Sequence, residues 1–600
     1  MAGIASSLAR ASRVTRAVVL AALAGAGLGA GVPARAADPV VLTVPREGQF
    51  ETLDPQRSYD GFSYEVLRNL YSNLLTYSYL ERPYKLVPEL LAAMPSLSAD
   101  RLTLTFTLRP GVRFADDPCF PGGKGRVVTS DDVLFSLRRY ADARVNVKTW
   151  FAMKGAVVGL DEFHAASEKA APEVDFSGRD IAGLHKVDAT TFTIRLTQPS
   201  PLFLYALTLS STSIVPVEAV RFYKERLSVH AVGTGPFHLV GDADRKGTLH
   251  LLRNPDYFGT YPSVGEPGDA ARGLLKDAGK RLPLVDVLDM PLIEEAQPEA
   301  LKFLHGDIDW YNADRASFAR LARRGPDGEF RIVDAESARI GLAVTPEPSV
   351  MYLAVNMKDA LLGTNKKLRQ ALAAAVDVQE QIERLKNGRG RAIASVVPYE
   401  LPGNERDTGT PVRHRDLALA RRLLAEAGFP NGAGLPPITF TLFRADAEAH
   451  DLADLLRTQL AAVGVKLRPV YMDMPTYDKA VIAGNFQLVL GYWLVDYPDA
   501  ENVYQLLYSR NAAPGPNMGD WVNAAYDRAY EASRLMPDGP ARLAHFKAMD
   551  ALIVDEAPVF DLWNPLRVSF YRSWLLNFKR NPMLPEEMFL RIDTDKRKAP

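Results

Sequence analysis

The chain has 600 residues, too many for a single hydrophobic core, so we expect two or three domains. Hydrophobic residues make up 47% of the sequence and charged residues 24%, which are ordinary globular values and exclude a largely disordered chain. A formal net charge of −1 offers no basic surface and argues against nucleic acid as a partner.

The first 36 residues have the pattern of a secretory signal. Three arginines precede an apolar run over 17–28, and the small residues at 34–36 provide a cleavage site. The run is shorter than the roughly 20 apolar residues that cross a bilayer, which favours a cleaved signal over a membrane anchor. We expect export, with a mature chain that begins near Ala37.

Loss of the signal makes the chain acidic. The segment contains four Arg and no acid, so 67 of the 71 basic groups remain against 72 acidic groups, a net charge of −5. This sign disfavours electrostatic binding to nucleic acid or to anionic membranes. Cys119 is the single cysteine, so neither an internal disulfide nor a thiolate metal cluster can form.

Strands and helices alternate along the first half of the chain. In "RLTLTFTLRPGVRF" apolar residues at every second position from Leu102 to Leu108 predict a strand with one buried face, and "TFTIRL" repeats the pattern from Phe192. Between them, Thr129 opens "TSDDVLFSLRRY" with the N-cap signal of a helix. This part is predicted to be α+β.

The order of strand and helix is more regular in the second half. "RHRDLALARRLLAEAGFPNG" predicts a helix ended by Gly428 and Pro430, and it precedes a strand "ITFTLF", a helix "DLADLLRTQLAAVG" and the strands "VKLRPVY" and "FQLVLGYW". This order is typical of an α/β unit with a largely parallel sheet.

Motifs for catalysis or for a cofactor are sparse. The nine His form neither HExxH nor a close pair, which disfavours a zinc site. "VGTGPF" contains a GxG at Gly233 and Gly235, but Pro236 follows, so a turn is favoured over a dinucleotide loop. GxSxG, SxxK and GxxxxGK[ST] are missing. We predict no metal and no cofactor, and no nucleophile is indicated.

Asp496 is unusual because it ends an apolar strand. "FQLVLGYWLV" is nearly continuous in apolar residues, as a strand buried on both faces would be. Ligands of open α/β sheets bind beyond the carboxyl ends of strands, which is where Asp496 lies. Asp also commonly caps turns, here the turn Tyr497-Pro498-Asp499. Residue type and spacing leave both roles open.

Seven segments occur in the order found in one protein family. They are "TLDPQRSYDGFSYEVLRNLYSNLLTY", "LVPELLAAMPSLSADRLTLTFTLRPGVRF", "VVTSDDVLFSLRRYAD", "GTGPF", "ALKFLHGDIDW", "YLAVNM" with "KLRQALAAAVD", and "GYWLVDYPDAENVY". Through them the chain resembles the extracytoplasmic solute-binding proteins of family 5, the periplasmic oligopeptide- and dipeptide-binding proteins that serve ABC importers. The motifs cover most of the mature chain.

The resemblance implies an α/β fold of two lobes, the type II, cluster C-like fold of periplasmic binding proteins. The first lobe would be split into two subdomains, and a two-strand hinge, crossing near Asp309 and Asn564, would let the lobes close over a ligand. The expected parts are a signal peptide (1–36), subdomain I of lobe 1 (37–80, 201–310 and 566–600), subdomain II of lobe 1 (81–200) and lobe 2 (311–565).

The resemblance also implies a function. The chain would be a soluble, monomeric periplasmic receptor without a cofactor, not an enzyme, that passes oligopeptides to a membrane ABC permease. In peptide-binding members an Asp of a "W..DY" motif pairs with the α-ammonium group of the ligand, and Asp496 matches it. An unpaired buried charge costs about 3 to 5 kcal/mol, so peptides with a free N-terminus would be selected.

The residues around Asp496 have two possible roles. Trp493 and Tyr497 would either line the cleft, offering aromatic faces to the ligand, or pack the end of the strand. Strand alternation places Trp493 and Val495 on one face and Leu494 and Asp496 on the other. Both aromatic rings therefore cannot share the Asp496 face if the strand stays regular.

Backbone contacts are expected on both sides of the cleft. The strand end from Trp493 to Val495 would add an extended peptide as a further strand. The resemblance places a second contact at Tyr59, Asp60 and Gly61. One departure from the family is "ADDPCFPGGKGR", which lengthens the turn after "RPGVRF" and carries Cys119.

Two alternatives remain. The same scaffold also carries binders of nickel chelates, haem and oligosaccharides, and a fold does not choose among ligands. Asp496 favours peptide among them, because a sugar does not need a buried charge. An alternative of another class is a periplasmic hydrolase whose acids perform the chemistry.

Overall fold

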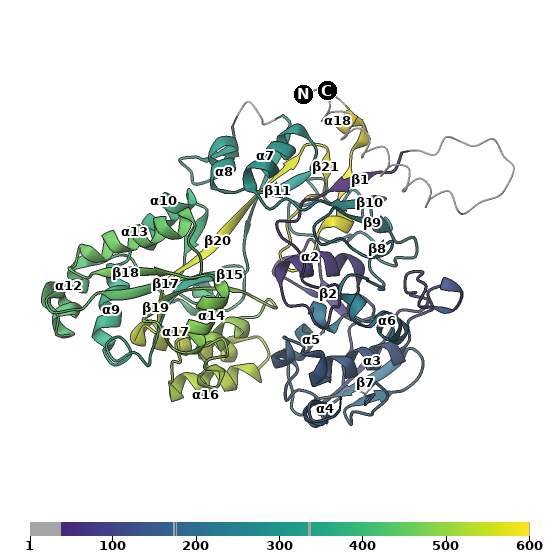
Figure 1. The fold of residues 1–600 in the computed structure, drawn as a ribbon, viewed down its shortest axis with the longest axis horizontal. Helices are drawn as coiled ribbons and strands as arrows, with labels where there is room; N and C mark the ends of the chain where they lie inside the picture. Colours follow the sequence, from purple (N-terminus) through teal and green to yellow (C-terminus); the bar gives the residue numbers. More distant parts are fainter. Residues whose placement is uncertain (1–37, 172–173, 176, 334–337, 599–600) are drawn as a thin grey trace. The chain divides into compact units, whose positions relative to one another are not determined.

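The computed structural model of the protein describes residues 38–171, 174–175, 177–333 and 338–598 (Figure 1). The predicted signal peptide lies outside these ranges. In the part of the chain that is described, no helix is long and apolar enough to span a bilayer.

The first sheet has four strands in the order β1 (Val41–Thr43), β10 (Val287–Met290), β9 (Leu249–Arg253) and β8 (Phe237–Leu239). Only β1 and β10 are parallel. Leu251 and Leu288 lie in the core of this region. Helix α2 (Gly61–Leu70) packs against the same core through Val66, Leu67 and Leu70, and a hairpin of β2 (Leu75–Tyr77) and β3 (Leu86–Pro88) follows it.

The second sheet confirms the alternating strands that the sequence predicts. Its order is β4 (Ser96–Leu97), β5 (Thr103–Thr107), β7 (Thr191–Arg195) and β6 (Leu184–Lys186), with all pairs antiparallel. Phe106 and Phe192 stack across the pair β5–β7, with ring centroids 4.9 Å apart. Helices α3 (Ser130–Ala141) and α4 (Leu160–Glu168) accompany the sheet. The predicted cap of α3 is present, since the Thr129 N–H donates to the Asp132 carboxylate at 2.8 Å.

The largest sheet lies in the second half of the chain and has eight strands. Its path is β11 (Trp310–Asn312), β20 (Val559–Arg572), β15 (Ser349–Val355), β19 (Leu488–Leu494), β17 (Ile438–Leu442) and β18 (Leu467–Tyr471), while β14 (Ile340–Pro346) and β16 (Gly390–Ala392) also pair with β20. The parallel α/β unit that the sequence predicts is present, because β17 pairs in parallel with β18 and with β19, the three strands expected there. Strands β14, β15, β16 and β20 join this α/β unit by antiparallel ladders.

Helices cover this sheet and complete the rest of the fold. The helices next to the sheet are α9 (Lys366–Ala375), α10 (Val378–Lys386), α12 (Leu417–Glu426), α13 (Ala447–Ala461), α14 (Met474–Ile482) and α17 (Pro540–Glu556), and α16 (Ala524–Arg534) packs on α17 (Figure 1). The remaining elements are α5 (Phe203–Ala206), α6 (Val217–Tyr223), α7 (Ala296–His305), α8 (Arg315–Leu321), α11 (Glu405–Thr408), α15 (Glu501–Tyr504), α18 (Thr594–Lys598), β12 (Ala322–Arg324), β13 (Phe330–Ile332), β21 (Leu575–Leu576) and β22 (Arg591–Ile592).

Strand β20 joins two groups of strands, as its long yellow arrow in Figure 1 shows. Its first half pairs with β15 and β16, and its second half, from Leu566, pairs with β11 and β14. Asn564 lies where the partners change, and its buried side-chain amide donates to the carbonyl oxygens of Glu347 and Ser349 at 2.6 and 2.9 Å. Asp309 directly precedes β11 and accepts from the Thr43 N–H at 2.8 Å.

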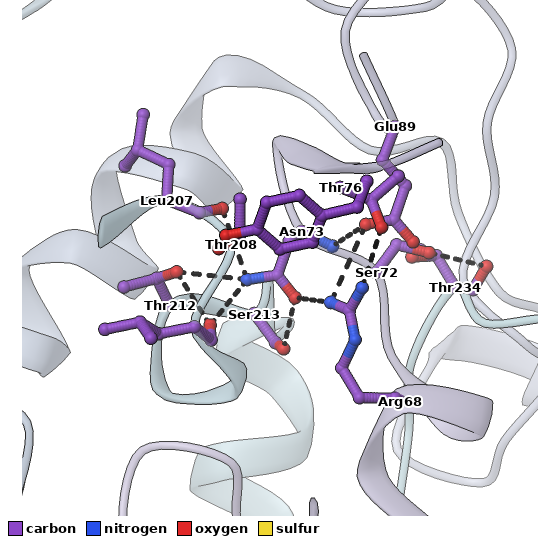
Figure 2. Close-up of polar contacts among 12 residues, drawn as sticks. Arg68, Ser72, Asn73, Thr76, Glu89, Leu207, Thr208, Thr212, Ser213 and Thr234 are labelled. Carbon is purple, nitrogen blue, oxygen red and sulfur yellow. Dashed lines mark hydrogen bonds and ion pairs between the residues drawn. The ribbon is translucent and has the colours of Figure 1, made fainter. Parts of the chain in front are cut away.

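A buried polar network holds α2 against the loop that follows α5 (Figure 2). The Arg68 guanidinium of α2 donates to the Asn73 side-chain oxygen at 2.7 Å, and the Asn73 N–H donates to the Glu89 carboxylate at 2.8 Å. The Asn73 amide then donates to the Leu209 carbonyl at 2.6 Å and to the Thr212 hydroxyl at 3.0 Å. Each of these hydrogen bonds replaces a bond that the same group makes to water in the unfolded chain. The network therefore fixes the position of α2.

The lengthened loop with Cys119 is anchored by a histidine. The two His230 ring nitrogens lie 2.9 Å from Asp117 and 2.8 Å from Asp242, and the ring stacks on Tyr223 with centroids 3.9 Å apart. The Cys119 N–H also donates to Asp117, at 2.8 Å. Burial opposes a charge on the imidazole, but the two carboxylates outweigh it, and the pKa of His230 is raised above its ordinary value.

This histidine makes the stability of the protein depend on pH. Because the folded-state pKa of His230 lies above the unfolded value of about 6.5, its contribution is complete below that pH and is lost as the pH rises through the folded pKa. We expect His230→Gln to lower Tm more at pH 6 than at pH 9. Thermal unfolding of both proteins across this range tests it, and a difference that grows with pH would contradict it.

Candidate ligand-binding site

Asp496 lies just beyond the end of β19, is partly buried and is hydrogen-bonded to Asn502. Its Oδ2 accepts from the Asn502 side-chain amide at 3.0 Å, and its own N–H donates to the Asn502 Oδ1 at 3.0 Å. Burial raises the pKa of Asp496 to about 6, and the nearby Glu501 charge adds to the increase. The carboxylate is therefore mostly ionised at neutral pH.

The turn after β19 is capped by a different acid. The Asp499 Oδ1 accepts from the Glu501 N–H at 2.8 Å, at the start of α15. Both Asp499 oxygens also receive the Arg542 guanidinium at 2.7 Å, a pair buried at 6% and 4% side-chain exposure. Since Asp499 performs the capping, the Asp496 carboxylate remains directed at other side chains.

The structure places Tyr59 beside Asp496. The Tyr59 side chain is 48% exposed, and partial loss of solvation together with the nearby Asp496 charge raises the pKa of Tyr59. The next two residues start α2. The Asp60 carboxylate caps it by accepting from the Ser63 N–H at 2.8 Å, and the Asp60 carbonyl accepts from Tyr64, so Asp60 is engaged within its own helix. Gly61 borders open space.

The two aromatic residues flanking Asp496 lie differently from each other. Trp493 is partly buried, and its indole N–H donates to the Asn502 Oδ1 at 2.9 Å. Tyr497 is buried, its hydroxyl donates to Glu501 at 2.5 Å, and its ring stacks on Tyr205 of α5 with centroids 5.6 Å apart. β19 ends at Leu494, so strand alternation no longer applies to Asp496.

Burial changes along β19. Leu488 to Gly491 are buried, as predicted, but Tyr492 and Leu494 are exposed. Val495 is buried, and its N–H donates to the Pro348 carbonyl at 2.9 Å, so its N–H is occupied. In an antiparallel ladder, residues whose N–H and C=O groups bond to the neighbouring strand alternate with residues whose groups point away from it. The bond of Val495 to Pro348 shows that Val495 and Trp493 are the residues that bond to β15. The N–H and C=O groups of Tyr492 and Leu494 consequently face away from β15.

A cavity of about 180 Å³ adjoins this strand end; we call it the hinge pocket. It is bordered by Gly61 and Glu65 of α2, Trp310 of β11, Leu494 of β19 and Arg567 of β20, together with residues 580–587. A wider cleft of about 870 Å³ shares part of this lining. Two of the predicted ligand residues, Gly61 and Leu494, thus border one cavity.

Asn502 was not predicted from the sequence, although it connects Trp493 to Asp496. The only signal is its place in "DYPDAENVY", where a fully buried Asn has to find partners. We expect Asn502→Ala to lower the free energy of unfolding by about 1 to 3 kcal/mol, because the Trp493 and Asp496 N–H groups lose their acceptor. Chemical denaturation measures it, with the exposed Asn485→Ala as control; equal effects of the two variants would contradict it.

Comparisons with known proteins place this chain in a family. Residues 85–515 match the profile described as bacterial extracellular solute-binding proteins, family 5 Middle. The chain is 25% identical over 520 residues to the dipeptide-binding protein of Escherichia coli, covering 85% of this chain and 87% of that protein. It is 26% identical over 483 residues to heme-binding protein A of Haemophilus influenzae, covering 79% and 78%.

The fold agrees with a solved structure of the same class. The periplasmic binding protein DppA of Helicobacter pylori, in complex with the peptide STSA, superposes with a TM-score of 0.70 at 20% identity, covering 92% of this chain and 99% of that one. The two-lobed fold expected from the sequence is thereby confirmed. The profile match spans well over half of the residues, and the chain belongs to the bacterial extracellular solute-binding proteins of family 5.

Proposed function

We propose that the protein is a periplasmic receptor that captures oligopeptides and delivers them to the membrane permease of an ABC importer. The observation that carries the proposal is the Asp496 carboxylate, partly buried at the end of β19 and held by Asn502 and Tyr59. An ionised acid in this position suits the α-ammonium group of a peptide. The dipeptide-binding relative supports the same ligand class.

Asn502 and Tyr59 orient the Asp496 carboxylate before the ligand arrives. The Asn502 amide donates to its Oδ2 and Tyr59 lies beside it, so the carboxylate is held in position and is only partly satisfied by protein groups. An ammonium–carboxylate bond is roughly twice as strong as a neutral one. N-acetylation would remove the charge and place a methyl group against the carboxylate, so the clamp selects a free N-terminus.

The peptide backbone would be bound by strand addition along β19. The free groups are those of Tyr492 and Leu494, rather than those of Trp493 and Val495, because the latter pair with β15. The parallel ladder with β17 involves only Leu488 and Val489. An extended peptide that starts at Asp496 can therefore pair with this open edge through main-chain bonds that are independent of sequence.

Lobe closure would use β20, which joins the two groups of strands, and a second crossing near Asp309, which directly precedes β11. We assign lobe 2 to residues 311–565 and lobe 1 to the remainder of the mature chain, with 81–200 as its subdomain II; β20 changes partners at Asn564, next to one boundary. The stacking of Tyr205 on Tyr497 is one contact that opening has to break. Export by the N-terminal signal and periplasmic location belong to the same proposal.

Retention of intact ligand distinguishes a receptor from a hydrolase. The mature protein is incubated with a mixture of tripeptides to pentapeptides, separated from free ligand, denatured, and its bound fraction identified by mass spectrometry. We expect intact peptides with free N-termini and no products over time. Accumulating cleavage products would overturn the receptor in favour of a hydrolase.

A further inference from the structure

The hinge pocket is bordered by more acidic than basic side chains. Six carboxyl groups border it against two guanidinium groups; the acids are Glu47, Glu65, Glu299, Glu347, Glu586 and Glu587. Arg567 is paired with Glu347, and Arg580 with Glu586 at 3.0 Å. Among the described residues, the other four acids form no ion pair.

Glu299 is the most deeply placed of these four acids. It lies on the inward face of α7 with Phe303, is 5% exposed, and borders both the hinge pocket and the wider cleft. Its Oε1 is buried without a hydrogen-bond partner in the described part of the chain. A carboxyl oxygen left in this state costs free energy unless a ligand supplies the donor.

A second unpaired group borders the same pocket. The Trp310 indole N–H is buried and has no acceptor among the described residues. Its neighbour is the Arg580 guanidinium, 4.3 Å from the indole ring centroid. The pocket therefore offers one free acceptor and one free donor, as a site for a peptide segment with a cationic side chain and a carbonyl oxygen would.

We propose that the hinge pocket binds the cationic side chain of a lysine or arginine residue of the ligand peptide, with Glu299 as the acceptor and Glu47 and Glu65 as neighbouring charges. The inference rests on the proposed peptide-binding function and adds a side-chain preference to it. Broad main-chain binding along β19 would coexist with one selective pocket.

Cation binding at Glu299 is coupled to proton release. Burial, then the charges of Glu47 and Asp314, raises the pKa of Glu299 to about 8, so the empty pocket holds it protonated at neutral pH. The other titratable groups that border the pocket include Tyr311 of β11, Glu65 of α2, Glu587, and the Glu347–Arg567 and Glu586–Arg580 pairs. A bound ammonium favours ionised Glu299, so the preference for a cationic side chain increases as the pH rises toward 8.

The test compares matched peptides by isothermal titration calorimetry. Alanine tripeptides carry lysine at the first, second or third position. Matched tripeptides carry norleucine at the same position, which keeps the aliphatic chain without the charge. A pair with arginine and citrulline repeats the comparison. We expect lysine to bind at least tenfold more tightly than norleucine at one position, with a ratio that grows from pH 6 to pH 8. Asp496 contacts the α-ammonium group of both peptides in the same way, so its contribution cancels in the ratio of their dissociation constants.

Variants assign the preference to Glu299. Glu299→Gln keeps the side-chain shape and should reduce the lysine-to-norleucine ratio toward one, while Glu47→Gln should reduce it less. Glu295→Gln, at the exposed N-cap of the same helix, is the matched control and should leave the ratio as in the wild type. A wild-type ratio near one at every position, or a ratio unchanged by Glu299→Gln, overturns the assignment.

The same data separate this inference from the proposed function. If trialanine binds but lysine and norleucine peptides bind equally, only the cationic pocket is wrong. If no tripeptide binds at any pH, the peptide receptor itself is wrong and the pocket assignment fails with it.

Discussion

Replacement of Asp496 by alanine is expected to weaken peptide binding at least tenfold, or by about 1.4 kcal/mol. The α-ammonium group of the ligand would otherwise face only Asn502 and Tyr59, neither of which carries a charge at neutral pH. The protein should still unfold cooperatively, because burial of the ionised carboxylate does not favour folding: it raises the pKa of Asp496 to about 6. Calorimetric titration with trialanine measures the effect.

The pH dependence of binding gives an independent check on Asp496. The ligand needs the ionised carboxylate, so wild-type affinity should fall about tenfold for each pH unit below 6, while the alanine variant should lack this dependence. The exposed Asp478→Asn, in α14, is a control of similar charge change. Unchanged affinity of the Asp496 variant for a free-amine peptide would restore the interpretation of Asp496 as a structural residue.

Replacement of Arg542 by methionine is expected to cause the largest loss of stability, about 3 to 5 kcal/mol. The guanidinium makes two bonds of 2.7 Å to the Asp499 carboxylate, and both side chains are buried. Methionine keeps the aliphatic stem but leaves a buried carboxylate without its countercharge. Because Asp499 also accepts from the Glu501 N–H at the start of α15, which carries Asn502, peptide binding should weaken as well.

A control and a rescue make the Arg542 experiment specific. Arg510→Met breaks an exposed pair with Glu531 in the same region, which should cost no more than about 1 kcal/mol. Adding Asp499→Asn to Arg542→Met removes the unpaired charge and should recover part of the loss. Equal denaturation midpoints for the Arg510 and Arg542 variants would show that the buried pair does not stabilise the fold.

Local patterns predicted the strands and helices well, but not how distant strands add to a sheet. Alternation from Leu102 and Phe192 gave β5 and β7, since one buried face leaves a period of two. The order of strand and helix gave the parallel unit of β17, β18 and β19. The antiparallel ladders of β15 and β20 were not predicted, because β20 is far in the sequence from the strands it joins.

The site shows the same limit. Asp496 could be singled out from the strand that precedes it, but its proximity to Tyr59 was not predicted, because it joins distant segments. The Val495 N–H is not free, because it donates to the Pro348 carbonyl. Only the register of β19 against β15 reveals this bond. Glu299 is one acid among several in "EEAQPEAL", and burial alone distinguishes it.

The most direct test is a thermal-shift measurement on the mature protein, freed of bound ligand by partial unfolding and refolding. Tripeptides to pentapeptides are compared with free and with acetylated N-termini. A ligand at 100 times its Kd adds about 2.7 kcal/mol to the free energy of unfolding, which is a visible rise in Tm. The account predicts that only free-amine peptides stabilise the protein. Equal stabilisation by acetylated peptides, or no stabilisation by any peptide, would contradict it.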